Sequence, residues 1–163
     1  MARFAAAAAL FVFCAFVAAT VTVSASHSNL TVKGTVLLDY CNAGFETEAA
    51  VPLAGATVKL MCNCRKSYTA THTDYAVTDL NGEYTFSVQD HGDDVCDATL
   101  VSSSHTDASA PLRGRDSSRL SLTHNNGMVD GTRQANILLS GVKTPLARCG
   151  QILARYHLND DNF

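Results

Sequence analysis

Apolar and polar residues alternate in several short stretches of the chain, and this pattern predicts β-strands. A period of two places one face of a strand in a core and the other face in solvent. The stretches cover residues 32–40, 57–64, 83–88 and 96–101, and a further strand is expected from Gln134 to Leu139. Short strands separated by turns predict an all-β fold, a small antiparallel sandwich or barrel with Greek-key-like connections.

Turn-forming residues separate the predicted strands. Asn81-Gly82 lies between two of the stretches and supplies the positive φ that a tight hairpin needs. Residues 125–127 (NNG) predict a second turn. The polar, turn-rich residues 102–119 predict a long surface loop, and residues 147–158 predict a short helical C-terminal tail.

The first 25 residues have the composition of a secretory signal peptide. Arg3 is the only charged residue before Lys33, residues 4–23 are apolar or small, and Val23-Ser24-Ala25 resembles a cleavage site. The alternative is an uncleaved anchor helix, because the apolar run is nearly long enough to span a bilayer. We expect cleavage after Ala25, which leaves residues 26–163 as a single extracellular β domain without a membrane span.

Five of the six cysteines lie beyond this segment, and the oxidising secretory route favours disulfides among them. Five is an odd number, so at most two bonds form within the chain and one thiol remains. Cys62 and Cys96 fall on the apolar faces of their predicted strands, where a bond across the core could join two sheets. Cys64 shares the face of Cys62 and competes for the same partner. The one-residue spacing of Cys62 and Cys64 does not match structural zinc sites, so no metal is expected.

Charge and motif content argue against several functions. The net charge of -3 lacks the basic surface that nucleic-acid binding requires. The sequence has no G-x-S-x-G motif and nothing selects a pair of carboxylates, so we predict no catalytic residue and no cofactor. The acidic residues 90–94 (DHGDD) lack the spacing of a calcium loop and predict a solvated turn. Asn29-Leu30-Thr31 is an N-glycosylation sequon, so we expect a glycan on Asn29.

Five motifs occur in order along the chain. They are residues 32–36 (VKGTV, with Gly34), 39–41 (DYC), 52–62 (PLAGATVKLMC, with Gly55), 78–84 (TDLNGEY, with Asp79, Asn81 and Gly82) and 96–103 (CDATLVSS). This order resembles the pollen-allergen (Ole e 1-like) and extensin family of secreted plant proteins, and the resemblance covers about residues 30–149.

The resemblance implies the disulfides Cys41–Cys149 and Cys62–Cys96, with Cys64 left as a free thiol. The chain departs from the family pattern at Leu38, which stands where the first family cysteine would be. The usual partner of that cysteine is also missing, since residues 103–115 contain none. The extensin part of the family name is not supported by composition, because three scattered prolines cannot form a proline-rich rod.

The same resemblance implies a non-enzymatic, secreted glycoprotein of the plant cell wall or apoplast. Such a protein would act as a binding or signalling module in growing tissue, with a receptor ectodomain or a cell-wall polymer as its partner. The alternatives are a carbohydrate- or small-molecule-binding sandwich and, less favoured, a small secreted hydrolase. The absence of tryptophan disfavours a sugar site built on a broad aromatic platform. The sequence gives no indication of the oligomeric state.

Overall fold

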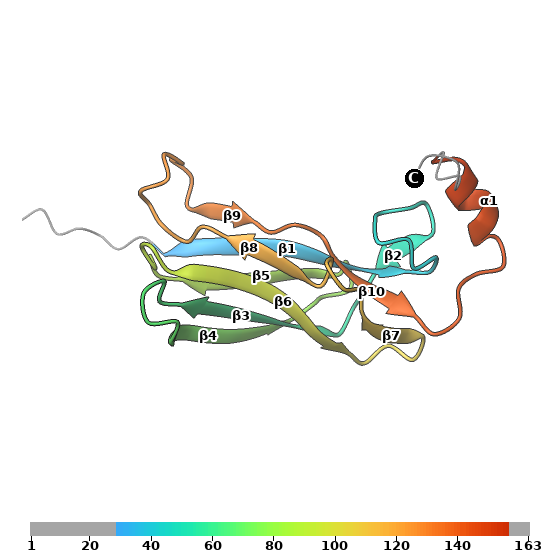
Figure 1. The fold of residues 1–163 in the computed structure, drawn as a ribbon, viewed down its shortest axis with the longest axis horizontal. Helices are drawn as coiled ribbons and strands as arrows, with labels where there is room; N and C mark the ends of the chain where they lie inside the picture. The colour runs from blue at the N-terminus through green and yellow to red at the C-terminus, as the bar shows by residue number, and fades with distance from the viewer. Residues whose placement is uncertain (1–28, 157–163) are drawn as a thin grey trace, which may run out of the picture.

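Two β-sheets pack face to face in the computed structural model, which describes residues 29–156 (Figure 1). The first sheet contains β1 (Leu30–Asp39), β2 (Ala50–Pro52), β5 (Glu83–Val88), β7 (Ala108–Pro111), β9 (Thr132–Gln134) and β10 (Leu138–Val142). The second sheet has the strand order β4 (Ala70–Val77), β3 (Ala56–Asn63), β6 (Val95–Ser103) and β8 (Ser117–Leu120). The predicted sandwich is confirmed, and the sheets do not close into a barrel.

Strand β1 organises the first sheet. Its first half pairs antiparallel with β5 and its last residues with β2, while β9 and β10 run parallel along its other edge. The sequence separation between paired residues increases by one along β1. Val32 pairs with Arg133, a separation of 101 (133 − 32), and Val36 pairs with Leu138, a separation of 102 (138 − 36). One extra residue is therefore accommodated between β9 and β10. This irregularity splits the single strand that the sequence predicts over residues 134–139.

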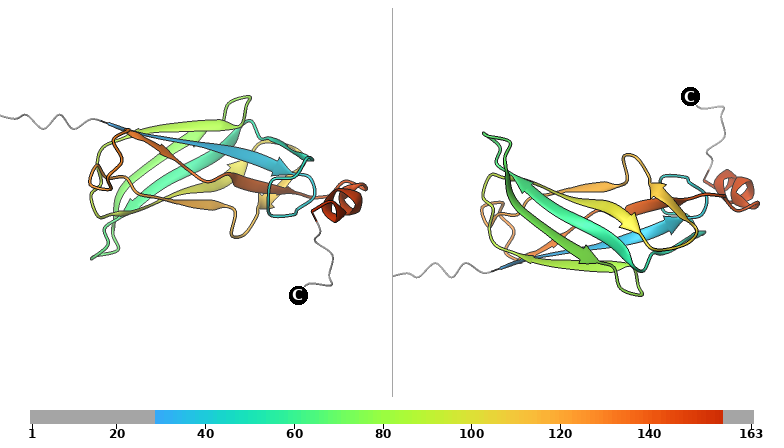
Figure 2. Two further views of the ribbon diagram at one scale, coloured as in Figure 1. Left: turned by 90° about the horizontal axis from the view of Figure 1, so that it is seen from above. Right: turned by 90° about the horizontal axis from the view of Figure 1, so that it is seen from below.

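Alternate side chains from the two sheets form the buried core between them. Figure 2 shows the strands of the two sheets from above and from below. Strand β3 buries every second residue from Ala56 to Cys62, and β5 buries Tyr84, Phe86 and Val88 in the same way. The predictions for β1, β3, β5 and β6 are thus confirmed to within two residues at each end. The burial pattern follows the period of two because each strand faces the core on one side only.

Two expectations about connecting segments are wrong. Residues 102–119 are not one long loop, since they contain the end of β6, all of β7 and the start of β8. Strand β7 pairs with β10 and β8 with β6, so ladder pairing overrides the polar composition of the segment. The turn at Asn81-Gly82 is present, with Gly82 at a φ of 72°, but it forms no hairpin. It carries the chain from β4 in one sheet to β5 in the other.

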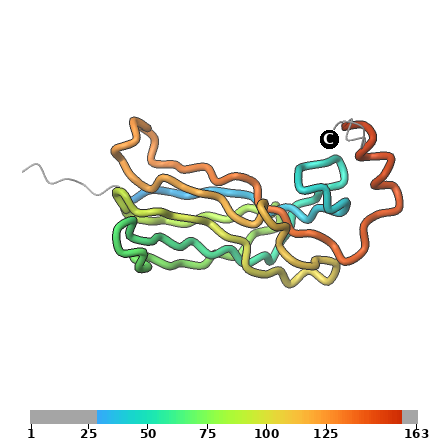
Figure 3. The backbone as a smooth tube through the Cα atoms, in the orientation of Figure 1, coloured from blue at the N-terminus to red at the C-terminus, as the bar shows by residue number. Residues whose placement is uncertain are grey.

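A second, smaller core lies at the end of the sandwich where β1 finishes. The short helix α1 (Cys149–Ala154) packs there against the segment that follows β1 (Figure 3). Cys41, Ala49, Cys149 and Ile152 form its buried cluster. The guanidinium of Arg155 also bonds both carboxylate oxygens of Glu48, at 2.9 and 2.7 Å. The predicted helical tail is therefore present between residues 149 and 154, and its expected end at residue 158 lies outside the described residues.

The predicted signal peptide, residues 1–25, also lies outside the described residues. Between residues 29 and 156, no helix has the length and apolar character needed to cross a membrane.

Candidate functional site

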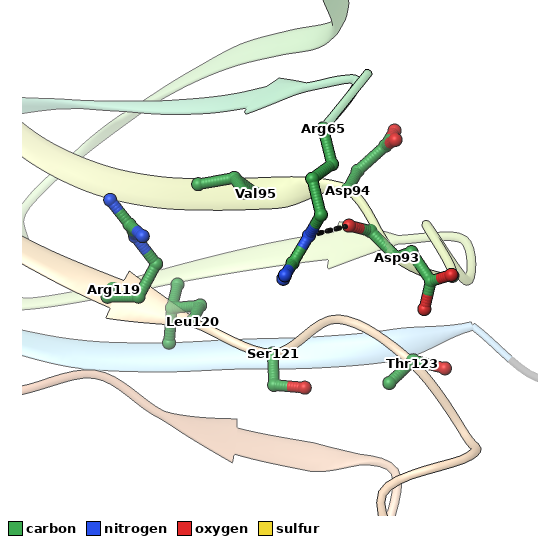
Figure 4. Close-up of a pocket in the computed structure, with 9 residues that line it drawn as sticks. Arg65, Asp93, Asp94, Val95, Arg119, Leu120, Ser121 and Thr123 are labelled. Atoms are coloured by element: carbon green, nitrogen blue, oxygen red, sulfur yellow. Dashed lines mark hydrogen bonds between the residues drawn. The ribbon is translucent and has the colours of Figure 1, made fainter. Parts of the chain in front are cut away.

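Two open hollows adjoin each other at the end of the sandwich opposite α1, and we call them together the arginine trough. The first, of about 380 Å³, is lined by Arg65, Gly92, Asp93, Asp94, Val95, Arg119, Leu120, Ser121 and Thr123 (Figure 4). The second, of about 320 Å³, is lined by Asn63, Cys64, Arg65, Tyr68, Val95, Asp97 and Arg119. They share Arg65, Val95 and Arg119, so the two arginines stand at the centre of one continuous depression.

Both arginines are held in place through a single nitrogen. Arg65, in the turn between β3 and β4, donates from Nε to the carbonyl oxygen of Asp93 at 3.3 Å. Arg119, on the outer face of β8, donates from Nε to Oδ1 of its cross-strand partner Asp97 at 2.6 Å. The terminal guanidinium nitrogens of both side chains have no hydrogen-bond partner among residues 29–156. Each guanidinium is thus anchored at Nε, and its terminal nitrogens are free of protein partners in the described part of the chain.

The charges around the trough are partly compensated. The hydrogen bond and the charge of Asp97 raise the pKa of Arg119 above its ordinary value. Asp94 accepts a hydrogen bond from Thr71 Oγ1 at 2.6 Å and lies 3.7 Å from His91 Nδ1. Asp97 and Asp94 are therefore engaged with side chains beside the trough.

Asp90 fixes the loop that forms one wall of the trough. Its carboxylate accepts hydrogen bonds from the backbone amides of His124 at 2.8 Å and Gly92 at 2.6 Å, and both lower its pKa. These bonds connect the β5–β6 loop to the segment that follows β8. The acidic residues 90–94, predicted as a solvated turn, form this β5–β6 connection.

The far end of the trough is the turn between β3 and β4. Tyr68 adopts a φ of 56°, and its side chain is 84% exposed. Its amide donates to the carbonyl of Cys64 at 2.8 Å, and the amide of Cys64 donates to Thr69 at 2.9 Å, which closes the turn. The hydroxyl of Ser67, followed by the amides of Ser67 and Lys66, lowers the pKa of the Cys64 thiol.

The four cysteines expected to bond do so in the structure. Cys41 is bonded to Cys149 with a Cα–Cα distance of 5.3 Å, and Cys62 to Cys96 with 4.0 Å. Cys64 forms no disulfide. Cys62 and Cys96 are direct partners on the adjacent strands β3 and β6, so their bond staples one sheet. The idea that this bond joins the two sheets is therefore wrong, because both strands belong to the same layer.

The remaining predicted residues lie away from the trough or shape turns. Asn29 is exposed immediately before β1. Gly34 lies opposite Tyr84, and Gly55 sits at a φ of 70° between β2 and β3. Asp79 Oδ1 accepts hydrogen bonds from the amides of Asn81 at 2.8 Å and Glu83 at 2.9 Å, which stabilises the turn before β5. These motif residues therefore support the fold, and none of them lines the trough.

Sequence reasoning missed the residues that make the trough. Arg65, Tyr68 and Arg119 belong to no motif, and only the pairing of β8 with β6 brings Arg119 beside Asp97. The outward phase of Asp97 in its predicted strand is a signal, but its cross-strand partner Arg119 lies in residues 102–119, whose composition predicts a loop. Among the described residues, no group of three or more His, Cys, Asp or Glu side chains is arranged to hold a metal ion.

Comparison with known proteins agrees with this architecture. The family model described as "Pollen protein Ole e 1 like" matches residues 28–157. The chain belongs to the Ole e 1-like family of pollen proteins. Pollen allergen Cro s 1 of Crocus sativus is 36% identical, with 84% of each chain covered. Pollen allergen Phl p 11 of Phleum pratense is 38% identical over 79% of this chain and 92% of its own length.

Two further relatives extend the comparison. Anther-specific protein LAT52 of Solanum lycopersicum is 36% identical over 66% of this chain and 67% of its own length. The crystal structure of the major plantain pollen allergen Pla l 1 is similar with a TM-score of 0.65 and 28% identity, covering 72% of this chain and 97% of that one. The relatives are named as pollen allergens or as pollen- and anther-specific proteins, and none of these names denotes an enzyme.

Proposed function

We propose that this protein is a secreted, non-enzymatic binding module of the plant cell wall or apoplast, which acts in growing tissue through the arginine trough. Its partner is a cell-wall polymer or a receptor ectodomain. The observation that carries the proposal is the pair of guanidinium groups in a solvent-facing depression, each anchored at Nε and without a partner for its terminal nitrogens among residues 29–156. Guanidinium donors that have no protein partner are available for bidentate binding of an external group.

The geometry of the trough favours binding over catalysis. An arginine stays protonated and cannot exchange a proton during a reaction. Two of the carboxylates that line the trough are engaged, Asp97 by Arg119 and Asp94 by Thr71. The Cys64 thiol has no histidine among its hydrogen-bond partners in the described part of the chain, so it lacks the base of a nucleophile–base pair. The small secreted hydrolase is therefore the weaker alternative.

The test uses the full chain secreted from a plant host and recovered with its disulfides intact. The immobilised protein is probed with an array of wall polysaccharides and a panel of receptor ectodomains, and is assayed in parallel against ester and glycoside substrates. We expect saturable binding to at least one partner that an Arg65→Gln, Arg119→Gln variant loses, with no turnover. Turnover that a single substitution abolishes, or binding that survives the double substitution, contradicts the proposal.

A further inference from the structure

We infer that the arginine trough is a binding site for acidic sugars, and that it takes a short segment of a uronic acid polymer through its carboxylates. This inference rests on the proposed function, because it names the ligand of the same site. Arg65 and Arg119 are the two residues that would bind the carboxylates directly. Tyr68, Ser121 and Thr123 line the parts of the trough that would contact the sugar rings.

The first step concerns the donors. A guanidinium whose Nε is already bonded keeps four N–H donors on its two terminal nitrogens, and two of these can bind one carboxylate bidentately. Arg65 and Arg119 both have this arrangement, and the bond to Nε restricts the rotamers of each side chain. Less side-chain conformational entropy is therefore lost when a ligand binds.

The second step concerns the walls. Ser121 and Thr123 place hydroxyl groups at one end of the trough, and Val95 supplies an apolar surface between the arginines (Figure 4). Tyr68, at the other end, exposes its aromatic ring. A uronate carries a carboxylate, several hydroxyls and an apolar C–H face on one ring, so it matches all three kinds of surface. Tyrosine supplies a smaller platform than tryptophan, but it is an amphipathic ring of the kind that favours such contacts.

The third step concerns size and access. Hollows of about 380 and 320 Å³ that share three lining residues fall within the range of small-ligand sites. Both are open to solvent, so a bound segment is not enclosed and its ends can continue beyond them. This geometry suits a stretch of a linear polymer better than an enclosed small molecule.

The last step concerns charge. Asp93, Asp94 and Asp97 also line the trough, and free carboxylates there repel an anion. Asp97 is bonded to Arg119, and Asp94 accepts a hydrogen bond from Thr71 and faces His91. Repulsion from Asp94 and Asp97 is therefore reduced. The exposed carboxylate of Asp93 has no partner among residues 29–156, so the site is not strongly basic. We expect recognition to depend on the bidentate geometry of each guanidinium more than on net charge. Replacing a guanidinium with another cation should therefore weaken binding.

The experiment measures the dissociation constant of a tetramer of α-1,4-linked galacturonic acid by calorimetry, on the full chain with its disulfides intact. The fully methyl-esterified tetramer keeps the sugar rings but loses the carboxylates. Arg65→Gln and Arg119→Gln remove the guanidinium donors. Arg65→Lys keeps the positive charge but removes the planar pair of terminal N–H donors. Arg113→Gln, on the exposed loop between β7 and β8, is the matched control for loss of one positive charge. Thermal unfolding of every variant verifies that the fold is kept.

We expect either glutamine variant, Arg65→Lys and the methyl ester to weaken binding by about tenfold or more, and Arg113→Gln to leave it within about twofold. Cys64 lines the second hollow, so bound tetramer should also slow its alkylation by iodoacetamide. Equal losses for Arg113→Gln and Arg65→Gln would show unspecific attraction and overturn the inference. Stronger binding of tetraglutamate than of the sugar would overturn it in favour of an acidic protein partner.

Failure of this inference can be told apart from failure of the proposed function. If the tetramer does not bind but the protein binds a neutral polysaccharide or a receptor ectodomain through Arg65 and Arg119, only the acidic-sugar assignment is wrong. If the same preparation turns over a substrate and binds none of these partners, the proposed function itself is wrong.

Discussion

Tyr84 lies opposite Gly34 on neighbouring strands, and its ring occupies the space that a side chain at position 34 would fill. A Cβ at position 34 would overlap the phenol ring and hydroxyl. Tyr84 is only 2% exposed, and its hydroxyl has no hydrogen-bond partner among residues 29–156. Gly34 is therefore needed for a close approach across the strand pair, and the same approach leaves a polar atom unsatisfied in the core.

The first prediction is that Tyr84→Phe stabilises the protein. Phenylalanine keeps the ring over Gly34 and removes the buried hydroxyl, so the free energy of unfolding should rise by about 1 kcal/mol. Urea unfolding measures it. Tyr75→Phe is the matched control, because Tyr75 is 60% exposed on β4, and it should change stability by less than about 0.5 kcal/mol. A Tyr84→Phe variant less stable than the wild type would show that the hydroxyl has a partner.

The second prediction concerns alkaline pH. Burial raises the pKa of Tyr84 in the folded state. A group whose pKa is raised on folding stabilises the fold fully below its unfolded pKa, which is about 10 for tyrosine, and this contribution is lost as the pH rises above it. The free energy of unfolding should therefore fall from about pH 10 upward, and fall less in Tyr84→Phe. Urea titrations between about pH 8 and 11.5, with Cys64 blocked to prevent disulfide exchange, measure the difference. Parallel curves for the two proteins would contradict it.

How much of the fold the sequence predicts depends on how each strand is buried. Strands β1, β3, β5 and β6 carry apolar residues at alternate positions, so they were predicted closely. Strand β4 was missed because two of its inward positions, His72 and Asp74, are polar and no strong alternation marks it. Strand β7 has four residues and ends at Pro111, which gives too short a pattern to detect.

The trough was harder to predict, because it depends on contacts between segments far apart in the sequence. Arg65 meets the Asp93 carbonyl only because the β3–β4 turn and the β5–β6 loop lie at the same end of the sandwich. Alternation gives the face on which a residue lies, but it does not give strand order. Register and strand order were therefore the missing information.

The third prediction concerns Arg133, a charged residue that β9 buries to 4% exposure. Its guanidinium donates to the backbone carbonyls of Ser121, Thr123, Asp130 and Thr132, and so ties the β8–β9 loop to β9. Arg133→Met leaves these acceptors without a donor and should lower the free energy of unfolding by about 2–3 kcal/mol.

Arg113→Met, on an exposed loop, is the matched control and should change stability by less than about 0.5 kcal/mol. Hydrogen exchange should locate the loosening at residues 121–132. An Arg133→Met variant with wild-type stability would mean that water replaces the guanidinium at no cost.

The fourth prediction concerns processing and Asn29. Its exposed position before β1 makes it accessible to glycosylation, and the leading segment has the pattern of a signal peptide. Protein secreted by a plant host should begin within a few residues of Ser26 and carry one N-glycan, which Asn29→Gln removes. Intact-mass measurement and N-terminal sequencing check both points. Membrane-bound material that retains Met1 would contradict the secretion.

The last prediction concerns the disulfides and separates the two cores. Peptide mapping without reduction should recover Cys41 linked to Cys149 and Cys62 linked to Cys96, with Cys64 alkylated. The bond Cys41–Cys149 closes a separation of 108 residues, so replacing both cysteines with alanine should lower the free energy of unfolding by about 4–5 kcal/mol in the loop-entropy model.

Loss of the Cys41–Cys149 bond should destabilise the small core before the main core. Cys41 and Cys149 belong to the small core beneath α1, whereas the main core lies between the two sheets and includes neither. The amides of α1 should therefore exchange rapidly in the Cys41→Ala, Cys149→Ala variant while those of β3 and β6 stay protected. Cys64→Ser, the matched control, should leave exchange and stability unchanged. A Cys64–Cys96 peptide, or a dimer linked through Cys64, would show that the free thiol competes for the bond, and simultaneous loss of protection in α1 and β3 would show that the two cores unfold as one.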